Sequence, residues 1–158
     1  MKLSDEIKQA EFPDPHTEAV LSLHFTSHWL YRVLQDQLKE FDISNEQYNI
    51  LRILRGNRAH TYNLCEVQER MLNRTENSTR LVEKLRKRGL VSRQTNEEDR
   101  RRVDIAITPQ GLKLLAEMDE PVEEMNRRTA KALTGEEAQT LTRLLERLRD
   151  RLDVTNPL

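Results

Sequence analysis

Apolar residues recur at helical spacing along most of the chain. Between residues 16 and 40, Val20, Leu23, Leu30 and Leu34 follow one another at steps that place them on one face of a helix. At the usual rise per residue, that helix is ~37 Å long, which exceeds what a small domain needs to cover its own core. We therefore predict that a second chain shares this helix.

The middle of the chain has the pattern of one helix followed by a helix-turn-helix. Ser44 and Gln47 form a capping-box pattern at the start of a short, mostly apolar helix that Gly56 ends. Asn63 is typical of the cap of the next helix, and the polar stretch 73–76 is typical of a turn before a fourth helix. We expect the short apolar helix to be central.

After the fourth helix, the pattern changes from helical to alternating. Leu90 and Val91 start one strand, and residues 103–107 alternate apolar and polar side chains, so the two segments are predicted to pair as a β-hairpin. Pro109 is typical of the first turn of a helix, here a long one. Inside that helix, Pro121 predicts a kink or an offset, because proline has no backbone N–H to donate.

The chain closes with an amphipathic helix. Thr134 and Glu137 form a capping box, and the apolar residues that follow step by three and four, as in a short heptad seam. These residues are Ala138, Leu141, Leu145, Leu148 and Leu152.

Composition excludes several classes of protein. The 158 residues suit one domain, and charged residues make up 34% of them, with no apolar run near the ~20 residues that span a bilayer. The amino terminus lacks the apolar stretch of a secretory signal, so we expect a cytoplasmic protein without a membrane partner. Neither a phosphate-binding glycine loop nor a nucleophile elbow is present, so we expect no enzyme, no cofactor and no metal.

Charge is distributed unevenly along the chain. Residues 70–103 contain 11 basic and five acidic side chains, a net charge of +6, although the whole chain carries −1. One basic segment in a near-neutral protein indicates contact with a polyanion through that segment only. We therefore predict that this part of the chain binds double-stranded DNA.

The helix at 75–88 is the candidate for the major groove, because its apolar side is predicted to be buried and its other side is basic. Asn and Arg side chains can read bases, lysines suit phosphates, and three arginines at the hairpin tip can grip a minor groove. Asp99 can orient one of those arginines through hydrogen bonds. The residues predicted to contact DNA are Arg74, Thr75, Asn77, Ser78, Arg80, Lys84, Lys87, Asp99, Arg100, Arg101 and Arg102.

The predicted fold is mainly α with a small β-hairpin wing, a winged helix-turn-helix with long terminal dimerisation helices. Residues 1–42 form an N-terminal arm and dimerisation helix, residues 43–108 form the DNA-binding domain, and residues 109–158 form C-terminal dimerisation helices. A homodimer presents two recognition helices about one DNA turn apart, ~34 Å, to one side of the duplex.

Several runs resemble the MarR family of bacterial transcription regulators: Ser78 to Leu85, Lys87 to Val91, Asp99 to Val103 and Ile107 to Gly111. The resemblance extends from about residue 16 to residue 152, and its distinctive motifs lie in 67–111. It implies a homodimer on a pseudo-palindromic operator, and usually repression that a small molecule or an oxidant relieves. Residues 72–76 depart from the family pattern, which leaves the start of the recognition helix open.

The resemblance also implies a ligand pocket between the long helices and the DNA-binding domain. His28, Trp29, Tyr48 and Arg52 are the candidates for its lining, and Arg52 would pair with an anionic ligand such as an aromatic acid. Packing in the core or at the dimer contact is the alternative role of these aromatic residues.

Other interpretations stay open. His24 and His28 lie one helical turn apart and can hold a metal ion, although a structural role is favoured. Cys65 can be a thiol sensor, although Arg70 is the only nearby residue that would clearly activate the thiol, so a structural cysteine is favoured. The rival from another class is a helical dimeric adaptor whose basic segment contacts an acidic protein.

Overall fold

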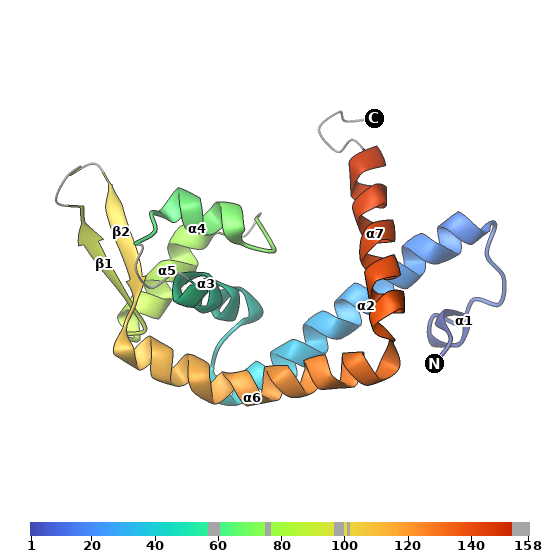
Figure 1. Cartoon of the computed structure of the whole chain (residues 1–158), viewed down its shortest axis with the longest axis horizontal. Helices are drawn as coiled ribbons and strands as arrows, with labels where there is room; N and C mark the ends of the chain where they lie inside the picture. The colour runs from blue at the N-terminus through green and yellow to red at the C-terminus, as the bar shows by residue number, and fades with distance from the viewer. Residues whose placement is uncertain (57–60, 75–76, 97–99, 101, 153–158) are drawn as a thin grey trace. The chain divides into compact units, whose positions relative to one another are not determined.

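The computed structural model describes residues 1–56, 61–74, 77–96, 100 and 102–152. In chain order these form α1 (Leu3–Glu6), α2 (Pro15–Leu38), the 3-10 helix η1 (Lys39–Phe41), α3 (Asn45–Gly56), α4 (Leu64–Arg70), α5 (Ser78–Lys87), β1 (Val91–Thr95), β2 (Val103–Ile107), α6 (Pro109–Ala132) and α7 (Gly135–Arg151) (Figure 1). The mainly helical fold with a two-stranded wing is thus confirmed. None of the described helices is long and apolar enough to cross a membrane.

The chain divides into two compact units, residues 1–119 and residues 120–158. The first unit contains every element from α1 to β2 and the first part of α6. The second contains the remainder of α6 and α7. The helix-turn-helix and the hairpin therefore lie within one unit.

Helix α2 starts where the sequence pattern changes and leaves its apolar side uncovered. The Asp14 carboxylate accepts hydrogen bonds from the backbone N–H groups of His16 (2.7 Å) and Thr17 (3.1 Å), and Pro15 occupies the first turn. Leu38 is the one buried residue of this helix. Its exposed large apolar side chains are Val20, Leu23, Trp29, Leu30 and Tyr31.

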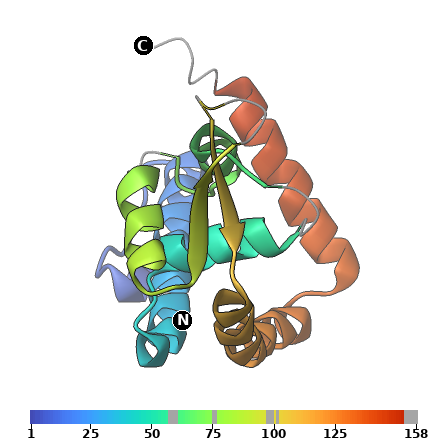
Figure 2. The ribbon, with the colours of Figure 1, turned by 90° about the vertical axis from the view of Figure 1, so that its left-hand side faces the viewer.

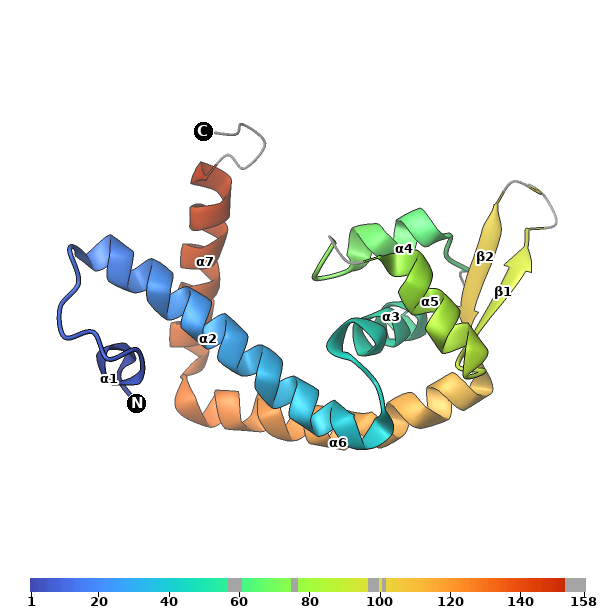
Figure 3. The same cartoon turned by 180° about the vertical axis from the view of Figure 1, so that it is seen from behind.

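The core of the first unit surrounds α3. This helix supplies four of the buried hydrophobic side chains, and α4, α5, β2, the end of α2 and the start of α6 supply others around it. Figure 3 shows α3 beneath α4 and α5. Members of this core are Leu38, Ile50, Leu51, Leu54, Val67, Leu85, Ile105 and Leu115. The short apolar helix is central, as its sequence predicts.

The hairpin consists of β1 and β2, paired antiparallel from Val91 opposite Ile107 to Thr95 opposite Val103. Figure 2 faces the hairpin, with α5 beside β1. A bridge joins the hairpin to the chain before α4, because Tyr62 and Ile105 exchange two backbone hydrogen bonds of 3.1 and 2.7 Å. The middle of β2 is thereby attached to the segment that precedes α4.

The link between α5 and β1 is packed tightly against the start of α6. Gly89 has a φ of +71°, the left-handed conformation that ends α5. The Thr108 hydroxyl donates to the Gly89 carbonyl (2.6 Å) and accepts from the Gly111 N–H (3.0 Å). A Cβ atom on Gly111 would lie 2.1 Å from the Leu90 carbonyl oxygen, so this position requires glycine.

Helix α6 runs through Pro121 without ending, from Pro109 to Ala132. The helix is therefore continuous at Pro121, the kink or offset expected there stays a prediction, and the boundary between the two compact units lies just before this residue.

The capping box of Thr134 and Glu137 is confirmed at the start of α7, and none of the residues of α7 is buried. Leu141 and Leu144 are each 47% exposed and Leu152 is 57% exposed. Of the predicted seam, Leu141 and Leu152 are therefore exposed in the single chain, whereas its other members are half-buried.

Candidate nucleic-acid interface

Helix α5 has an apolar side and a basic side, as its sequence predicts. Val82 and Leu85 are buried against the core, whereas Arg80, Lys84 and Lys87 are exposed. The exposed residues recur at four- and three-residue steps, which places them along one side of the helix. Three cations are thus presented on the surface of the helix-turn-helix.

The structure places Asn77 before α5 rather than on its exposed side. Its side-chain oxygen accepts a hydrogen bond from the Arg80 backbone N–H at 3.0 Å, which makes Asn77 the N-cap of a helix that begins at Ser78. Bidentate recognition of adenine needs this same oxygen as well as the amide N–H groups. Asn77 therefore serves first as a cap, and its predicted role as a bidentate base reader conflicts with that position.

Ser78 points into the fold and not outward. The residue is 3% exposed, and its hydroxyl donates to the Gln68 side-chain oxygen at 3.2 Å. This hydrogen bond joins the two helices of the helix-turn-helix. Because a buried hydroxyl cannot reach DNA, we leave Ser78 out of the interface.

One ion pair lies on the basic helix itself. Arg86 donates two hydrogen bonds of 2.8 Å to the Glu83 carboxylate. These hydrogen bonds hold the pKa of Glu83 below its ordinary value and raise that of Arg86. Arg86 is therefore the main partner of the Glu83 carboxylate, and the nearby charge of Lys87 lowers the pKa of Glu83 further.

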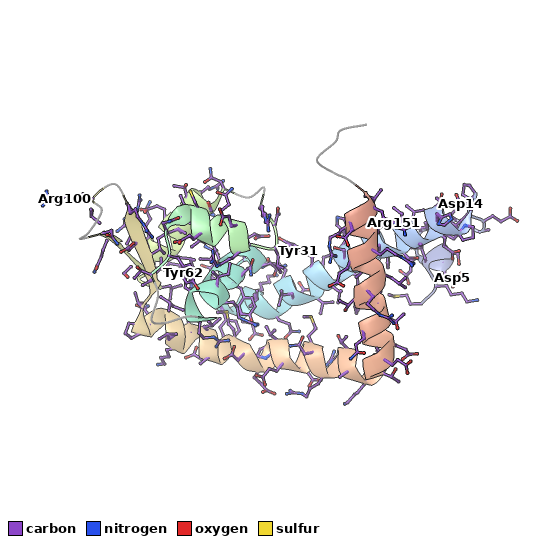
Figure 4. The ribbon with its side chains drawn as sticks, turned by 45° about the horizontal axis from the view of Figure 1, so that its top comes forward. Asp5, Asp14, Tyr31, Tyr62, Arg100 and Arg151 are labelled. Atoms are coloured by element: carbon purple, nitrogen blue, oxygen red, sulfur yellow. The ribbon has the colours of Figure 1, made fainter. Side chains whose placement is uncertain are left out.

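The described residues of the predicted wing tip are exposed arginines. Arg100 lies at the end of the hairpin (Figure 4), and Arg102 lies at its return, with its side chain 44% exposed. The guanidinium of Arg102 is 3.8 Å from the Glu66 carboxylate of α4. Arg74, in the turn before α5, is also exposed. Thr75, Asp99 and Arg101 lie outside the described residues.

A cavity of about 390 Å³ lies between the start of α4, α5 and the hairpin. Apolar side chains, including Val82 and Ile105, line it, and Arg93 and Arg102 add two cations. The exposed Cys65 is at its wall. Arg93 was not singled out from the sequence, since nothing in a strand pattern distinguishes it from other exposed arginines.

The four predicted ligand-binding residues do not line this cavity. Tyr48 and Arg52 are neighbours on α3, where the guanidinium donates to the phenol oxygen at 3.2 Å and lies 5.8 Å from the ring centre. On α2, Trp29 is 40% exposed, and the His28 ring nitrogen is 2.9 Å from the His24 carbonyl oxygen. The described residues contain no group of three His, Cys, Asp or Glu side chains placed to hold a metal ion.

An ion pair that sequence reasoning missed joins α3 to α6. Arg55 donates hydrogen bonds of 2.6 and 2.8 Å to the two oxygens of Asp119, with both side chains about one quarter to one third exposed. The two residues are 64 positions apart, so no local pattern indicates the pair. It joins α3 to the first part of α6 within the first compact unit.

Comparison with known proteins identifies the family and finds the same fold. Residues 43–103 match the MarR family model. The HTH-type transcriptional repressor IacR of Pseudomonas putida is 28% identical over 84% of this chain and 83% of that protein. The crystal structure of a MarR transcription factor from Planctomyces limnophilus is 34% identical, with a TM-score of 0.65 over 86% of this chain and 98% of that one. The fold also matches the MepR–DNA complex of S. aureus, at 24% identity and a TM-score of 0.75 over 85% of this chain and 96% of that one.

Proposed function

Because the chain belongs to the MarR family of winged helix-turn-helix transcription regulators, we propose that it represses transcription as a homodimer bound to a pseudo-palindromic operator. It is a DNA-binding regulator and not an enzyme. The observation that carries the proposal is α5, whose buried apolar side aims Arg80, Lys84 and Lys87 outward. We expect it to act in the cytoplasm.

The proposed contacts divide by chemistry. Arg80 reads base edges in the major groove, because a guanidinium can pair with guanine in two places. Lys84 and Lys87 neutralise phosphates as point charges. Arg100, Arg101 and Arg102 approach the minor groove or its phosphate walls, where Asp99 orients one of the guanidinium groups, and Arg74 and Thr75 contact the backbone before α5. Asn77 caps the helix and leaves its amide N–H groups for a water or a base.

Two uncovered apolar surfaces support the homodimer. One lies on α2 and includes Val20, Leu23 and Leu30, and the other lies on α7 and includes Leu141 and Leu144. Contiguous apolar surface on a soluble protein marks an interaction site, and a second copy of the same chain is the partner that the family implies. Two copies then present two α5 helices about one DNA turn apart, ~34 Å.

We also propose that a small aromatic acid relieves repression. The Arg52 guanidinium is the cation that would pair with its carboxylate, Tyr48 holds that guanidinium in place, and Trp29 and His28 supply the remainder of the lining. Such a ligand releases DNA only if it binds the released state more tightly than the DNA-bound state. Aromatic acids should then raise the melting temperature of the wild type but not that of Trp29→Ala.

Selection of bound sequences from a random duplex pool tests the DNA-binding proposal. A homodimer should select a site with two-fold symmetry, and its affinity should fall steeply with salt. Lys84→Ala should lower the slope of log affinity against log salt by about 0.9, since one phosphate contact is lost. The matched control is Lys131→Ala, an exposed lysine near the end of α6, which should leave the slope unchanged. Equally weak binding to random and selected DNA in low salt would refute the proposal.

A further inference from the structure

Arg88, the residue after the last turn of α5, connects the recognition helix to the first long helix. Its guanidinium donates one hydrogen bond to the Phe41 carbonyl at 3.0 Å and another to the Asp42 carbonyl. It also lies 3.7 Å from the Asp42 carboxylate. One side chain therefore joins the carboxyl end of α5 to the segment that ends α2 and η1, 46 and 47 positions earlier in the chain.

The two acceptor carbonyls explain why an arginine suits this position. Carbonyl groups at the end of a helix lack intrahelical donors and carry part of the negative end of the helix dipole. A planar guanidinium can donate to two of them at once and in a fixed plane, which a lysine cannot do. The Asp42 carboxylate is 97% exposed, so this ion pair adds little in comparison.

The segments on both sides of Arg88 are packed or hydrogen-bonded into the fold. Leu38 and Ile43, which flank the acceptor segment, are 0% and 2% exposed and belong to the core. On the other side, Gly89 is held in the left-handed conformation, and its carbonyl accepts the Thr108 hydroxyl. Because both segments are held in place, the hydrogen bonds of the Arg88 guanidinium fix the end of α5 relative to the end of α2 and η1.

We propose that Arg88 is a positioning residue for DNA recognition, which fixes the end of α5 against the end of α2 and η1 and so sets the direction in which the basic side of α5 is presented. The inference rests on the proposed DNA-binding function. Lys84 and Lys87, two of the cations of the last turn of α5, lie nearest to this anchor along the chain.

Base contacts and phosphate contacts respond differently to a small shift of the helix. Hydrogen bonds to base edges need defined geometry, whereas the attraction of lysines to the phosphate backbone tolerates displacement. Loss of the anchor should therefore reduce discrimination between operator and random DNA more than it reduces general affinity.

The experiment compares two neighbouring basic residues in the full-length protein. Binding of Arg88→Ala, Arg88→Lys and Lys87→Ala is measured on the selected operator and on a random duplex of equal length, across a salt series. For Arg88→Ala we expect about a tenfold loss of affinity for the operator, as for a lost base contact. Arg88→Lys should show most of this loss. For both variants, the affinity for random DNA and its salt slope should be unchanged. Lys87→Ala should weaken both DNAs and lower both slopes by about 0.9.

Three results would overturn the inference while leaving DNA binding intact. Wild-type affinity in Arg88→Lys would mean that charge alone matters. An equal loss on both DNAs with an unchanged slope would indicate a smaller folded fraction, and a lower slope would make Arg88 a phosphate contact. If Arg88→Ala does not fold, the ratio of operator affinity to random-DNA affinity in Arg88→Lys decides the question. Failure of the wild type to prefer any sequence would instead refute the proposed function.

Discussion

Gly111 allows the segment between α5 and β1 to pack against the first turn of α6. Its N–H binds the Thr108 hydroxyl, and its missing side chain lets the Leu90 carbonyl approach the first turn of α6. The run from Ile107 to Gly111, which resembles the family pattern, thus places Thr108 and Gly111 at a spacing that has a physical cause. The threonine caps α6 and ties it to Gly89, and the glycine admits the strand that follows α5.

Gly111→Ala should therefore destabilise the protein by about 1–3 kcal/mol, because the added methyl group overlaps a backbone carbonyl that a strand and a helix hold in place. Urea unfolding measures the difference. Gly135→Ala is the matched control, since nothing lies within 4 Å of a Cβ at that position and alanine is no worse than glycine in a helix. Equal stability of the two variants would show that the junction rearranges freely.

The candidate site could be predicted in part from single residues. The outward direction of Arg80, Lys84 and Lys87 follows from helical periodicity and from the buried Val82 and Leu85, so it is visible in the sequence.

Other residue roles depend on features that no local pattern reveals. Asn77 and Ser78 were misplaced because their roles depend on where α5 begins, and a shift of a few residues converts an exposed reader into a cap or a buried donor. Arg88 was missed because its acceptors are backbone carbonyls of a distant segment.

At the scale of elements, the sequence predicts where a helix begins and ends better than it predicts which other elements that helix packs against. The capping residues Asn63 and Thr134 are confirmed, as is the end of α5 at Gly89, because each depends on hydrogen bonds or dihedral angles within a few residues. Pro121 did not interrupt α6, since one missing donor can be tolerated within a long helix. The bridge between Tyr62 and Ile105 could not be predicted from the sequence, because it depends on which distant segments meet in the fold.

The cap of α2 makes a pH-dependent prediction. Hydrogen bonds from the Thr17 hydroxyl and then from the backbone N–H groups of Thr17 and His16 lower the pKa of Asp14 below its ordinary value. The cap therefore stabilises α2 at pH values above the ordinary range of an aspartate, and this contribution is lost as the pH falls through the lowered pKa. Thr17→Val removes the largest cause, so the pKa of Asp14 should rise toward its ordinary value.

An NMR titration of the Asp14 carboxyl carbon measures that change directly. Thr26→Val, at an exposed threonine farther along α2, serves as the control and should leave the titration unchanged. A pKa of Asp14 that does not respond to Thr17→Val would assign the shift to the backbone donors alone.

At the scale of the whole molecule, the uncovered leucines of α7 are the feature that a single chain does not explain. Introducing a charge there should oppose association, because the dimer would have to bury it without a partner. Leu141→Glu should raise the dimer dissociation constant at least about tenfold, corresponding to about 1.4 kcal/mol. Sedimentation at several protein concentrations provides the measurement.

Gln139→Glu adds the same charge to the same helix at an exposed polar position outside the predicted seam, so it should sediment like the wild type. Monomers in the wild type at every concentration would contradict the dimer. A wild-type distribution for Leu141→Glu would place the dimer contact elsewhere on the chain.

The exposed apolar residues of α2 and α7 also bear on how sharply a promoter would respond to this protein. If two copies must meet before either grips the operator strongly, then in the range where monomers predominate the amount of active repressor grows with the square of the cellular concentration. A modest fall in the synthesis of the protein, or its dilution through one round of cell division, would then lower the concentration of active repressor more than proportionally and so relieve repression. The exposed leucines of the single chain would in this way set the protein concentration below which repression is lost.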